Sequence, residues 1–186
     1  MSRFIRDNFF YTMLIKSVNG KTPSIPEDCY VAENATIIGE VSFGHSCSVW
    51  FNTVIRGDVN SITIGNKVNI QDGAVVHCTY QKHATVIGNN VSIGHNAIVH
   101  GCTIHDNVLI GMGAIVMDNC IVESNSIVTA GSVVTQNTVV ESGTIYAGVP
   151  AKKVKDIDVS DFAGEIQRIS NNYVMYSGWF KTEDKL

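Results

Sequence analysis

The sequence has very little leucine and little charge, and each shortage excludes a class of protein. Only 3 of its 186 residues are Leu, against 24 Val and 21 Ile, so a helical bundle is excluded and a β-rich core is expected. Charged residues make up 16% of the chain and the formal net charge is -4, which provides no positive field for nucleic acid. The hydrophobic content of 45% is enough to fill the core of one domain.

Cysteine pairs and long apolar runs are also missing. The five Cys residues include no C-x-x-C pair, which argues against a disulfide framework or a cysteine zinc ribbon and favours a reducing compartment. The apolar run over residues 9–15 is interrupted by Thr12 and is too short to span a membrane, so we interpret it as folded structure. We therefore expect a cytoplasmic protein that binds neither membranes nor nucleic acid.

What the sequence does contain is a six-residue repeat. An aliphatic or Phe residue recurs every six positions in four registers, and a small or β-branched residue usually stands four positions after it. Gly directly follows the leading residue in four repeats, as at Gly65 and Gly88, which suggests corners that need a permissive backbone. The 18 leading residues are Val31, Ile37, Phe43, Val49, Ile55, Ile64, Ile70, Val76, Ile87, Ile93, Val99, Ile104, Ile110, Val116, Val122, Val128, Val134 and Val140.

This spacing resembles the hexapeptide repeat of left-handed parallel β-helices, in which three hexapeptides form one triangular coil. The resemblance implies an all-β prism of about six coils, and the left-handedness is taken from the resemblance alone. After residue 155 the pattern changes to helical spacing, with Ser160 as the expected N-cap. We therefore predict a β-helix with an N-terminal cap over residues 1–155, and a helix packed along the prism, with a tail, over residues 156–186.

Counting repeats assigns each polar residue to a face of the prism. His77 and His100 directly follow leading residues that are one coil apart on the same face, once five extra residues between them leave as a loop. Arg56 occupies the position below His77 in the same column. His95 follows a leading residue of a different face, with Asp72 one coil beneath it.

The two stacked histidines suggest a metal site that is shared between subunits. Imidazoles about 4.8 Å apart, the spacing of neighbouring strands, can share a zinc ion. His95 lies on another face, so it would reach that ion only from a neighbouring prism. Repeating this contact around a threefold axis closes a homotrimer, in which Arg56 of one subunit would face Asp72 of the next. The other histidines, His45, His83 and His105, are interpreted as surface residues.

These residues, in this order, resemble the γ-class carbonic anhydrase family, most of all its small bacterial branch without the long acidic loop. The resemblance covers residues 29 to about 180. It implies a homotrimer that binds Zn, Fe or Co through His77 and His100 of one subunit and His95 of the next. The matching segments are Arg56-Gly57-Asp58, Asn69-Ile70-Gln71-Asp72-Gly73, His77, Gly94-His95 and His100-Gly101.

The implied chemistry is reversible hydration of CO2 to bicarbonate. Three neutral imidazoles on zinc leave a fourth position for water, whose pKa the metal lowers to about 7, and the metal-bound hydroxide attacks CO2. This would make the chain a carbonic anhydrase-like lyase. The resemblance assigns Gln71 to holding hydroxide or substrate, and it assigns Arg56, Asp58, Asn69 and Asp72 to the surroundings of the metal and the interface.

In one respect the chain departs from the best-characterised members, which carry proton-transfer glutamates just after the R-x-D motif and in an acidic loop. Val59 follows Asp58 here, and Cys78-Thr79-Tyr80 stands in place of a loop carboxylate. The small branch has a tyrosine in an N-Y-V segment of its C-terminal helix, and Asn172-Tyr173-Val174 matches that segment. The resemblance therefore assigns Tyr173 to the site.

Two other interpretations stay open. Many hexapeptide-repeat proteins transfer acetyl groups from acetyl-CoA with a histidine base on a long loop, and His83 is on a loop here, although a short one. The segment from Tyr146 to Lys152 occurs in both families. A trimeric metal-binding scaffold without useful turnover is the second alternative. Cys78 and Cys102 match no motif position and are interpreted as small buried or interface residues.

Overall fold

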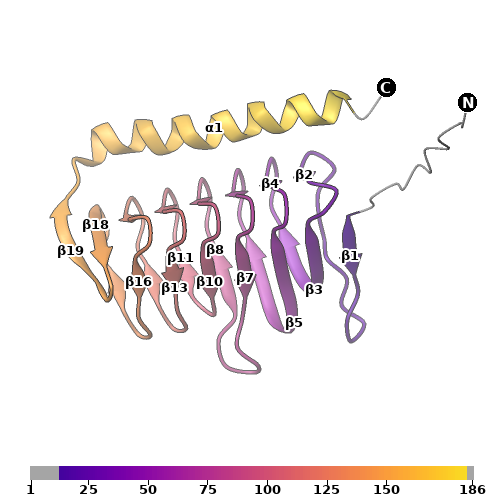
Figure 1. The fold of residues 1–186 in the computed structure, drawn as a ribbon, viewed down its shortest axis with the longest axis horizontal. Helices are drawn as coiled ribbons and strands as arrows, with labels where there is room; N and C mark the ends of the chain where they lie inside the picture. The colour runs from indigo at the N-terminus through magenta and orange to yellow at the C-terminus, as the bar shows by residue number, and fades with distance from the viewer. Residues whose placement is uncertain (1–12, 184–186) are drawn as a thin grey trace, which may run out of the picture.

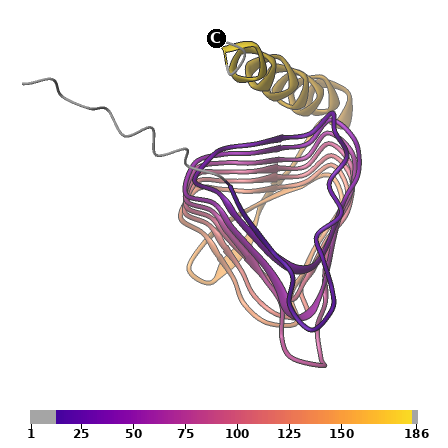
Figure 2. The same cartoon turned by 90° about the vertical axis from the view of Figure 1, so that its right-hand side faces the viewer.

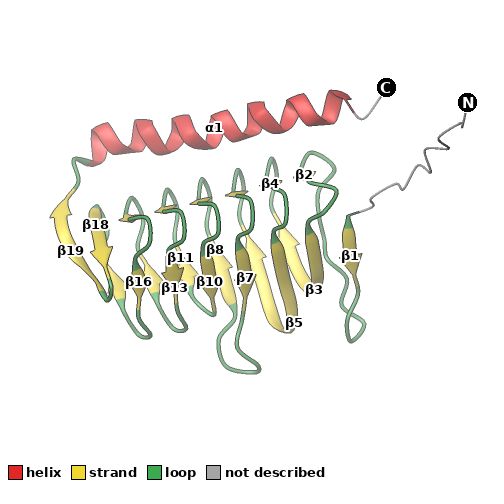
Figure 3. Ribbon diagram, in the orientation of Figure 1, coloured by secondary structure: helices red, strands yellow, loops and turns green. Residues whose placement is uncertain are grey.

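The hexapeptide repeats fold into short strands that stack into a parallel β-solenoid, shown in Figures 1 and 3. The computed structural model describes residues 13–183, so part of the predicted N-terminal run lies outside the described residues. The elements are β1 (Leu14–Lys16), β2 (Tyr30–Val31), β3 (Thr36–Phe43), β4 (Ser48–Val49), β5 (Val54–Ile64), β6 (Asn69–Ile70), β7 (Val75–His77), β8 (Thr85–Ile87), β9 (Ser92–Ile93), β10 (Ile98–His100), β11 (Thr103–Ile104), β12 (Leu109–Ile110), β13 (Ile115–Val116), β14 (Ile121–Val122), β15 (Ile127–Val128), β16 (Val133–Val134), β17 (Val139–Val140), β18 (Thr144–Gly148), β19 (Ala151–Asp156) and α1 (Val159–Glu183).

The solenoid has three faces, and Figure 2 shows its triangular cross-section. One face, here called the helix face, consists of β2, β4, β6, β9, β12, β15 and β18, paired in parallel. The second, called the histidine face, consists of β7, β10, β13 and β16 with the first parts of β3 and β5. The third consists of β8, β11, β14 and β17 with the last parts of β3 and β5.

The predicted β-helix with a C-terminal helix is confirmed, with one refinement in the number of coils. The 18 leading residues account for six turns. Tyr146 then continues the repeat on β18, where it pairs with Val128 and is buried, so the helix face has seven parallel strands. Tyr146 stands six positions after Val140, so it keeps the six-residue spacing and adds one strand to the 18 repeats of the six predicted coils.

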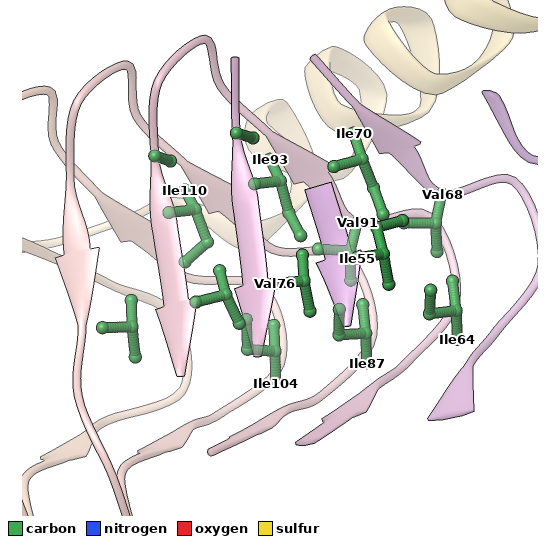
Figure 4. Close-up of a cluster of buried hydrophobic side chains, with 14 of the residues drawn as sticks. Ile55, Ile64, Val68, Ile70, Val76, Ile87, Val91, Ile93, Ile104 and Ile110 are labelled. Carbon is green, nitrogen blue, oxygen red and sulfur yellow. The ribbon is translucent and has the colours of Figure 1, made fainter. Parts of the chain in front are cut away.

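The leading residues fill the interior of the prism, as Figure 4 shows for part of the core. Ile55, Ile70 and Ile93 are fully buried, and so are small partners such as Ala97. Each buried Val or Ile contributes about 1.5–3 kcal/mol relative to an exposed one. Their branched Cβ atoms suit two-residue strands that repeat without interruption, which explains why the sequence uses Val and Ile in place of Leu.

The corners of the prism differ from the expectation that glycines after leading residues supply permissive backbone there. Gly65 and Gly88 have ordinary φ, and the left-handed corner positions are taken by asparagines, such as Asn96 with φ 57°, and by other glycines, such as Gly113 with φ 65°. The glycines are needed because a Cβ on Gly65 would lie 2.6 Å from the carbonyl oxygen of Gly88 in the next coil. The glycines that directly follow leading residues are therefore needed for the close approach of consecutive coils, and not for a left-handed backbone.

The C-terminal helix α1 runs back along the solenoid beside the helix face, against β2, β4 and β9 (Figure 1). It begins at Val159, so the predicted N-cap residue, Ser160, is the second residue of the helix. Ile166 of this helix is fully buried, and Tyr173 of the same helix packs edge-on against Trp50 with 5.6 Å between ring centroids. Within residues 13–183, no helix combines the length and the apolar character needed to cross a bilayer.

Candidate metal centre

Two histidines stack at the end of the histidine face. β7 and β10 are paired so that His77 lies directly beside His100, in the register that the repeat count predicts. Their ring centroids are 5.0 Å apart, and the Nδ1 atom of His77 faces the Nε2 atom of His100 at 3.1 Å. The two imidazoles therefore direct one nitrogen each at the same small region.

Each of these imidazoles is held from behind by a carboxylate. The Nε2 atom of His77 lies 3.1 Å from Asp58 Oδ1, and the Nδ1 atom of His100 lies 3.1 Å from Asp118 Oδ1. Burial alone would raise the pKa of both carboxyls, but hydrogen bonds outweigh it: Arg56 and His77 lower the pKa of Asp58, and Thr79 and His100 lower that of Asp118. Both groups are therefore carboxylates at neutral pH.

Arg56 lies in the predicted column with the two histidines. Ile55 pairs with Val76, so the next residue of each strand, Arg56 and His77, points out of the same face. Its guanidinium donates to Asp58 Oδ2 at 2.5 Å while 42% of its side chain stays exposed. Burial lowers the pKa of His77, and the Arg56 charge acts in the same direction against the opposing bond to Asp58, which favours the neutral imidazole.

His95 lies at the corner between the helix face and the histidine face, in the turn that joins β9 to β10. Its Nδ1 atom is 2.9 Å from Asp72 Oδ2, and Asp72 lies one coil below, as predicted. Residues Ala97 to His100 cross the width of the histidine face, which is about 10 Å of extended chain. Within one chain, residues 13–183 accordingly form no cluster of three His, Cys, Asp or Glu side chains that could hold a metal ion.

Gln71 and Tyr173 belong to the same side of the molecule as His95. Gln71 is buried, and its amide donates to Asn69 Oδ1 at 2.9 Å, while the Asn69 amide donates to Ser92 Oγ at 2.8 Å, so the two amides have fixed orientations. Tyr173 reaches this level of the prism from α1 and lines two grooves of about 390 Å³ each. One groove contains Gln71 and Met112 and the other contains Asp72 and His95.

The residues of the histidine pair fit a metal ion, although one chain supplies only part of a ligand set. Tetrahedral zinc with Zn–N distances of about 2.0–2.1 Å has neighbouring nitrogens about 3.3–3.4 Å apart. The facing nitrogens of His77 and His100 are 3.1 Å apart. A carboxylate on the far nitrogen of each ring is the usual support of a metal-bound histidine.

Comparison of the sequence with known proteins places the chain in a family. The chain is 50% identical over 152 residues to a probable carbonic anhydrase of Methanocaldococcus jannaschii, which covers 82% of this chain and 92% of that protein. It is 45% identical over 168 residues to a carbonic anhydrase of Geobacillus kaustophilus, covering 90% and 91%. It is 39% identical over 165 residues to the mitochondrial gamma carbonic anhydrase 2 of Arabidopsis thaliana, covering 86% and 59%. The chain belongs to the γ-class carbonic anhydrase family.

Comparisons with hexapeptide-repeat proteins support the fold of this γ-class family member. The names of these proteins also include a second activity, acyl transfer. Residues 84–116 and 101–136 match the bacterial transferase hexapeptide (six repeats) family. A hexapeptide transferase family protein of Anaplasma phagocytophilum is 40% identical with a TM-score of 0.85, covering 90% of this chain and 98% of that one. A putative acetyltransferase of Bacillus cereus is 34% identical with a TM-score of 0.88, covering 92% and 98%.

Two residues beside the histidine pair were not predicted for this γ-class carbonic anhydrase family member. Asp118 contacts His100, and the Thr79 hydroxyl donates to Asp118. Repeat counting could have found Asp118, since it stands one coil beyond Gly101. Cys78 and Cys102 are buried, as interpreted from the sequence, and burial raises the pKa of both thiols.

Proposed function

We propose that the protein is a homotrimeric, metal-dependent enzyme that interconverts CO2 and bicarbonate. The metal, Zn or alternatively Fe or Co, would be held by His77 and His100 of one subunit and by His95 of the next. The observation that carries this proposal is the pair of facing imidazole nitrogens, 3.1 Å apart, each on a ring whose other nitrogen contacts a carboxylate. Membership of the family supports the same reaction.

The chain's own residues would bind and orient the reactants. A zinc ion bound by three imidazoles supplies a hydroxide at neutral pH, because it lowers the pKa of water to about 7. Gln71 is held by Asn69 and borders an apolar groove that suits an uncharged substrate such as CO2. We assign the Gln71 carboxamide to hydrogen bonding with the reacting oxygens.

The homotrimer would bring the corner with His95 against the edge with His77 and His100. Within one chain Arg56 is paired with Asp58, and Asp72 with His95, yet 42% of the Arg56 side chain and 42% of the Asp72 side chain stay exposed. Both are therefore available for a further contact, and we propose that Arg56 pairs with Asp72 of the neighbouring subunit. The five cysteines are free thiols, which supports a reducing compartment such as the cytoplasm.

Proton transfer to solvent would depend on Tyr173, because Val59 and the segment 78–80 offer no carboxylate. Tyr173 borders both the groove with Gln71 and the groove with Asp72 and His95. Burial, with the Asp72 and Tyr176 charges, raises the pKa of the Tyr173 hydroxyl above its ordinary value, so the hydroxyl is protonated at neutral pH. Tyr173 would thus act as one link of a proton relay, which accepts a proton on its oxygen while it releases its own toward solvent.

Acyl transfer is the competing activity, favoured by the transferase names of the similar solved structures. His83, on the loop between β7 and β8, lines a polar groove of about 280 Å³ with Lys82 and Asn119. An acyltransferase that uses His83 as its base would turn over acetyl-CoA without added metal and would lose this activity in His83→Ala. Hydration of CO2 that needs metal and is unchanged in His83→Ala would exclude that alternative.

The decisive experiment is stopped-flow CO2 hydration by zinc-loaded protein, with the metal content measured on the same samples. We expect His100→Ala to abolish both activity and bound zinc. His105→Ala is the matched control, because His105 follows the leading residue Ile104 on the third face, where its Nε2 atom lies 3.8 Å from Glu123. Bound zinc without hydration in the parent protein would indicate a metal-binding scaffold.

The position of the site between subunits has its own test. His77→Ala and His95→Ala should each remove zinc from homotrimers, whereas mixed trimers of the two variants should regain some sites, since one junction can draw intact ligands from different chains. Mixed trimers that bind no zinc would contradict an intersubunit site.

A further inference from the structure

Asp118 occupies an unusual position for a turn residue of this solenoid. It follows β13, one coil beyond His100, and its carboxylate lies 3.1 Å from the Nδ1 atom of that histidine. The Thr79 hydroxyl, from the loop after β7, donates to the same Oδ1 atom. Only 16% of the Asp118 side chain is exposed. Two segments from different coils therefore converge on one shielded carboxylate.

The coil below leaves room for this carboxylate. Gly101 directly follows His100 and has φ 54°, and a Cβ at this position would collide with Asp118 Oδ1. Any other residue at position 101 would push Asp118 away from His100. The Gly101 carbonyl also accepts the backbone amide of Asn119 at 2.8 Å, which ties the Asp118 turn to the histidine strand.

A second aspartate, at the same position of its repeat but at another corner of the prism, shows what such a residue does without a histidine. Asp106 stands over Gly88, where a Cβ would likewise collide with Asp106 Oδ1. Its carboxylate accepts the backbone amide of Asn89 at 2.7 Å and the Asn89 side-chain amide at 3.2 Å. Asp106 thus closes a corner of the solenoid. Asp118 stands at the same position of its six-residue repeat, two residues after the leading residue, but it contacts a histidine and a threonine.

We propose that Asp118, oriented by Thr79, is a positioning residue that makes His100 present Nε2 to the metal. This inference rests on the proposed function of His100 as a metal ligand. A hydrogen bond from Nδ1–H to a carboxylate fixes the tautomer whose Nε2 lone pair is free, and it fixes the plane of the ring and raises the basicity of the ligand nitrogen. Asp58 supports His77 from the opposite side, so His77 presents Nδ1.

The test is the zinc affinity of the full-length protein, measured by competition with a chromogenic chelator at fixed pH. We expect Asp118→Asn to bind zinc about 10- to 100-fold more weakly than the parent protein, because a supporting partner of a metal-bound histidine has typically this effect. Thr79→Val should weaken binding less, since Asp118 keeps its charge. Asp106→Asn, the matched control, should leave zinc affinity within about twofold.

The visible absorption of the cobalt-substituted protein gives a second readout, which a loss of stability alone would not change. Asp118→Asn should shift the cobalt bands, and Asp106→Asn should not. Equal zinc affinities and equal spectra for these two variants would overturn the positioning role, and so would an affinity loss in Asp118→Asn matched by that in Asp106→Asn. If His100→Ala also binds zinc normally, the proposed function itself fails; normal binding in Asp118→Asn with none in His100→Ala rejects only the role of Asp118.

Discussion

The helix face and the histidine face are built from the same repeat, yet their outer surfaces differ. On the helix face, outward aromatic rings pack under α1: Trp50 lies 5.6 Å from Tyr173 and 5.4 Å from Phe180 between ring centroids. On the histidine face, the outward residues at one edge are Arg56, His77 and His100, joined by hydrogen bonds to carboxylates.

Because of this difference, the outer surface of the helix face contributes mainly to the stability of the fold, whereas the edge of the histidine face carries the residues of the proposed metal site. Both faces place leading residues in the shared core, so the interior tolerates either outer surface. The helix face gains further apolar burial outside the prism, whereas the histidine edge keeps polar groups oriented and partly exposed. The residues assigned to one metal centre are divided between these surfaces, with His95 at the corner of one and His77 and His100 at the far edge of the other.

The largest effect on folding is expected from Trp50→Ala on the helix face. Trp50 is buried, contacts four aromatic rings and donates to Ser48 Oγ at 3.0 Å. Removing a buried tryptophan costs about 3–5 kcal/mol of unfolding free energy. Urea denaturation of the metal-free protein measures this loss. Trp179→Ala on α1 is the control, because Trp179 is 57% exposed and its loss should cost about 1 kcal/mol or less. Equal losses would contradict the assignment of stability to the buried cluster.

Much of this comparison follows from the sequence, because a parallel ladder repeats its register in every coil. Once the six-residue spacing sets the leading residues, the outward position after each one is set too, which is why His77 beside His100 and Asp72 beneath His95 were predicted correctly. The loop after β7 does not break this logic, since the chain returns to register at Thr85.

The sequence could not predict the contacts that depend on the orientation of side chains at the corners of the prism. Repeat counting places Asp118 one coil beyond Gly101, but its contact with His100 also requires the space above Gly101 and the Thr79 hydroxyl from another coil. The aromatic contact between Trp50 and Tyr173 depends on where α1 lies along the prism, which helical spacing alone does not fix. That His77, His95 and His100 bind one metal stays a prediction, because it concerns a neighbouring subunit.

A smaller effect on folding is expected from Arg56→Ala on the histidine face. The Arg56 pair with Asp58 is partly exposed, so its loss should cost less than about 1 kcal/mol within the subunit. If Arg56 also contacts Asp72 of the next subunit, the trimer should dissociate at higher protein concentrations than the parent. Sedimentation velocity over a concentration series measures this. Arg56→Lys keeps the charge but not the two-pronged geometry, and it should restore association only in part. Unchanged association of Arg56→Ala at both low and high salt would rule out the contact.

The smallest effect on folding is expected from Tyr173→Phe, which removes one hydroxyl and keeps the ring contacts with Trp50 and Tyr176. Unfolding free energy should change by about 0.5 kcal/mol or less. The Tyr173 hydroxyl stays protonated at neutral pH because its pKa is raised, so it can carry the proton only by accepting one on its oxygen while it releases its own. Proton transfer by a positioned side chain contributes typically about 100-fold or more, and for such an indirect relay we expect CO2 hydration to fall about 10-fold. The loss should shrink as imidazole buffer is raised, since the buffer can carry the proton instead. A loss of CO2 hydration that added buffer does not relieve would contradict a role in proton transfer. It would mean that the Tyr173 hydroxyl acts through packing at the corner with His95, so that Tyr173 would contribute to the stability of the helix face and not to the chemistry of the site.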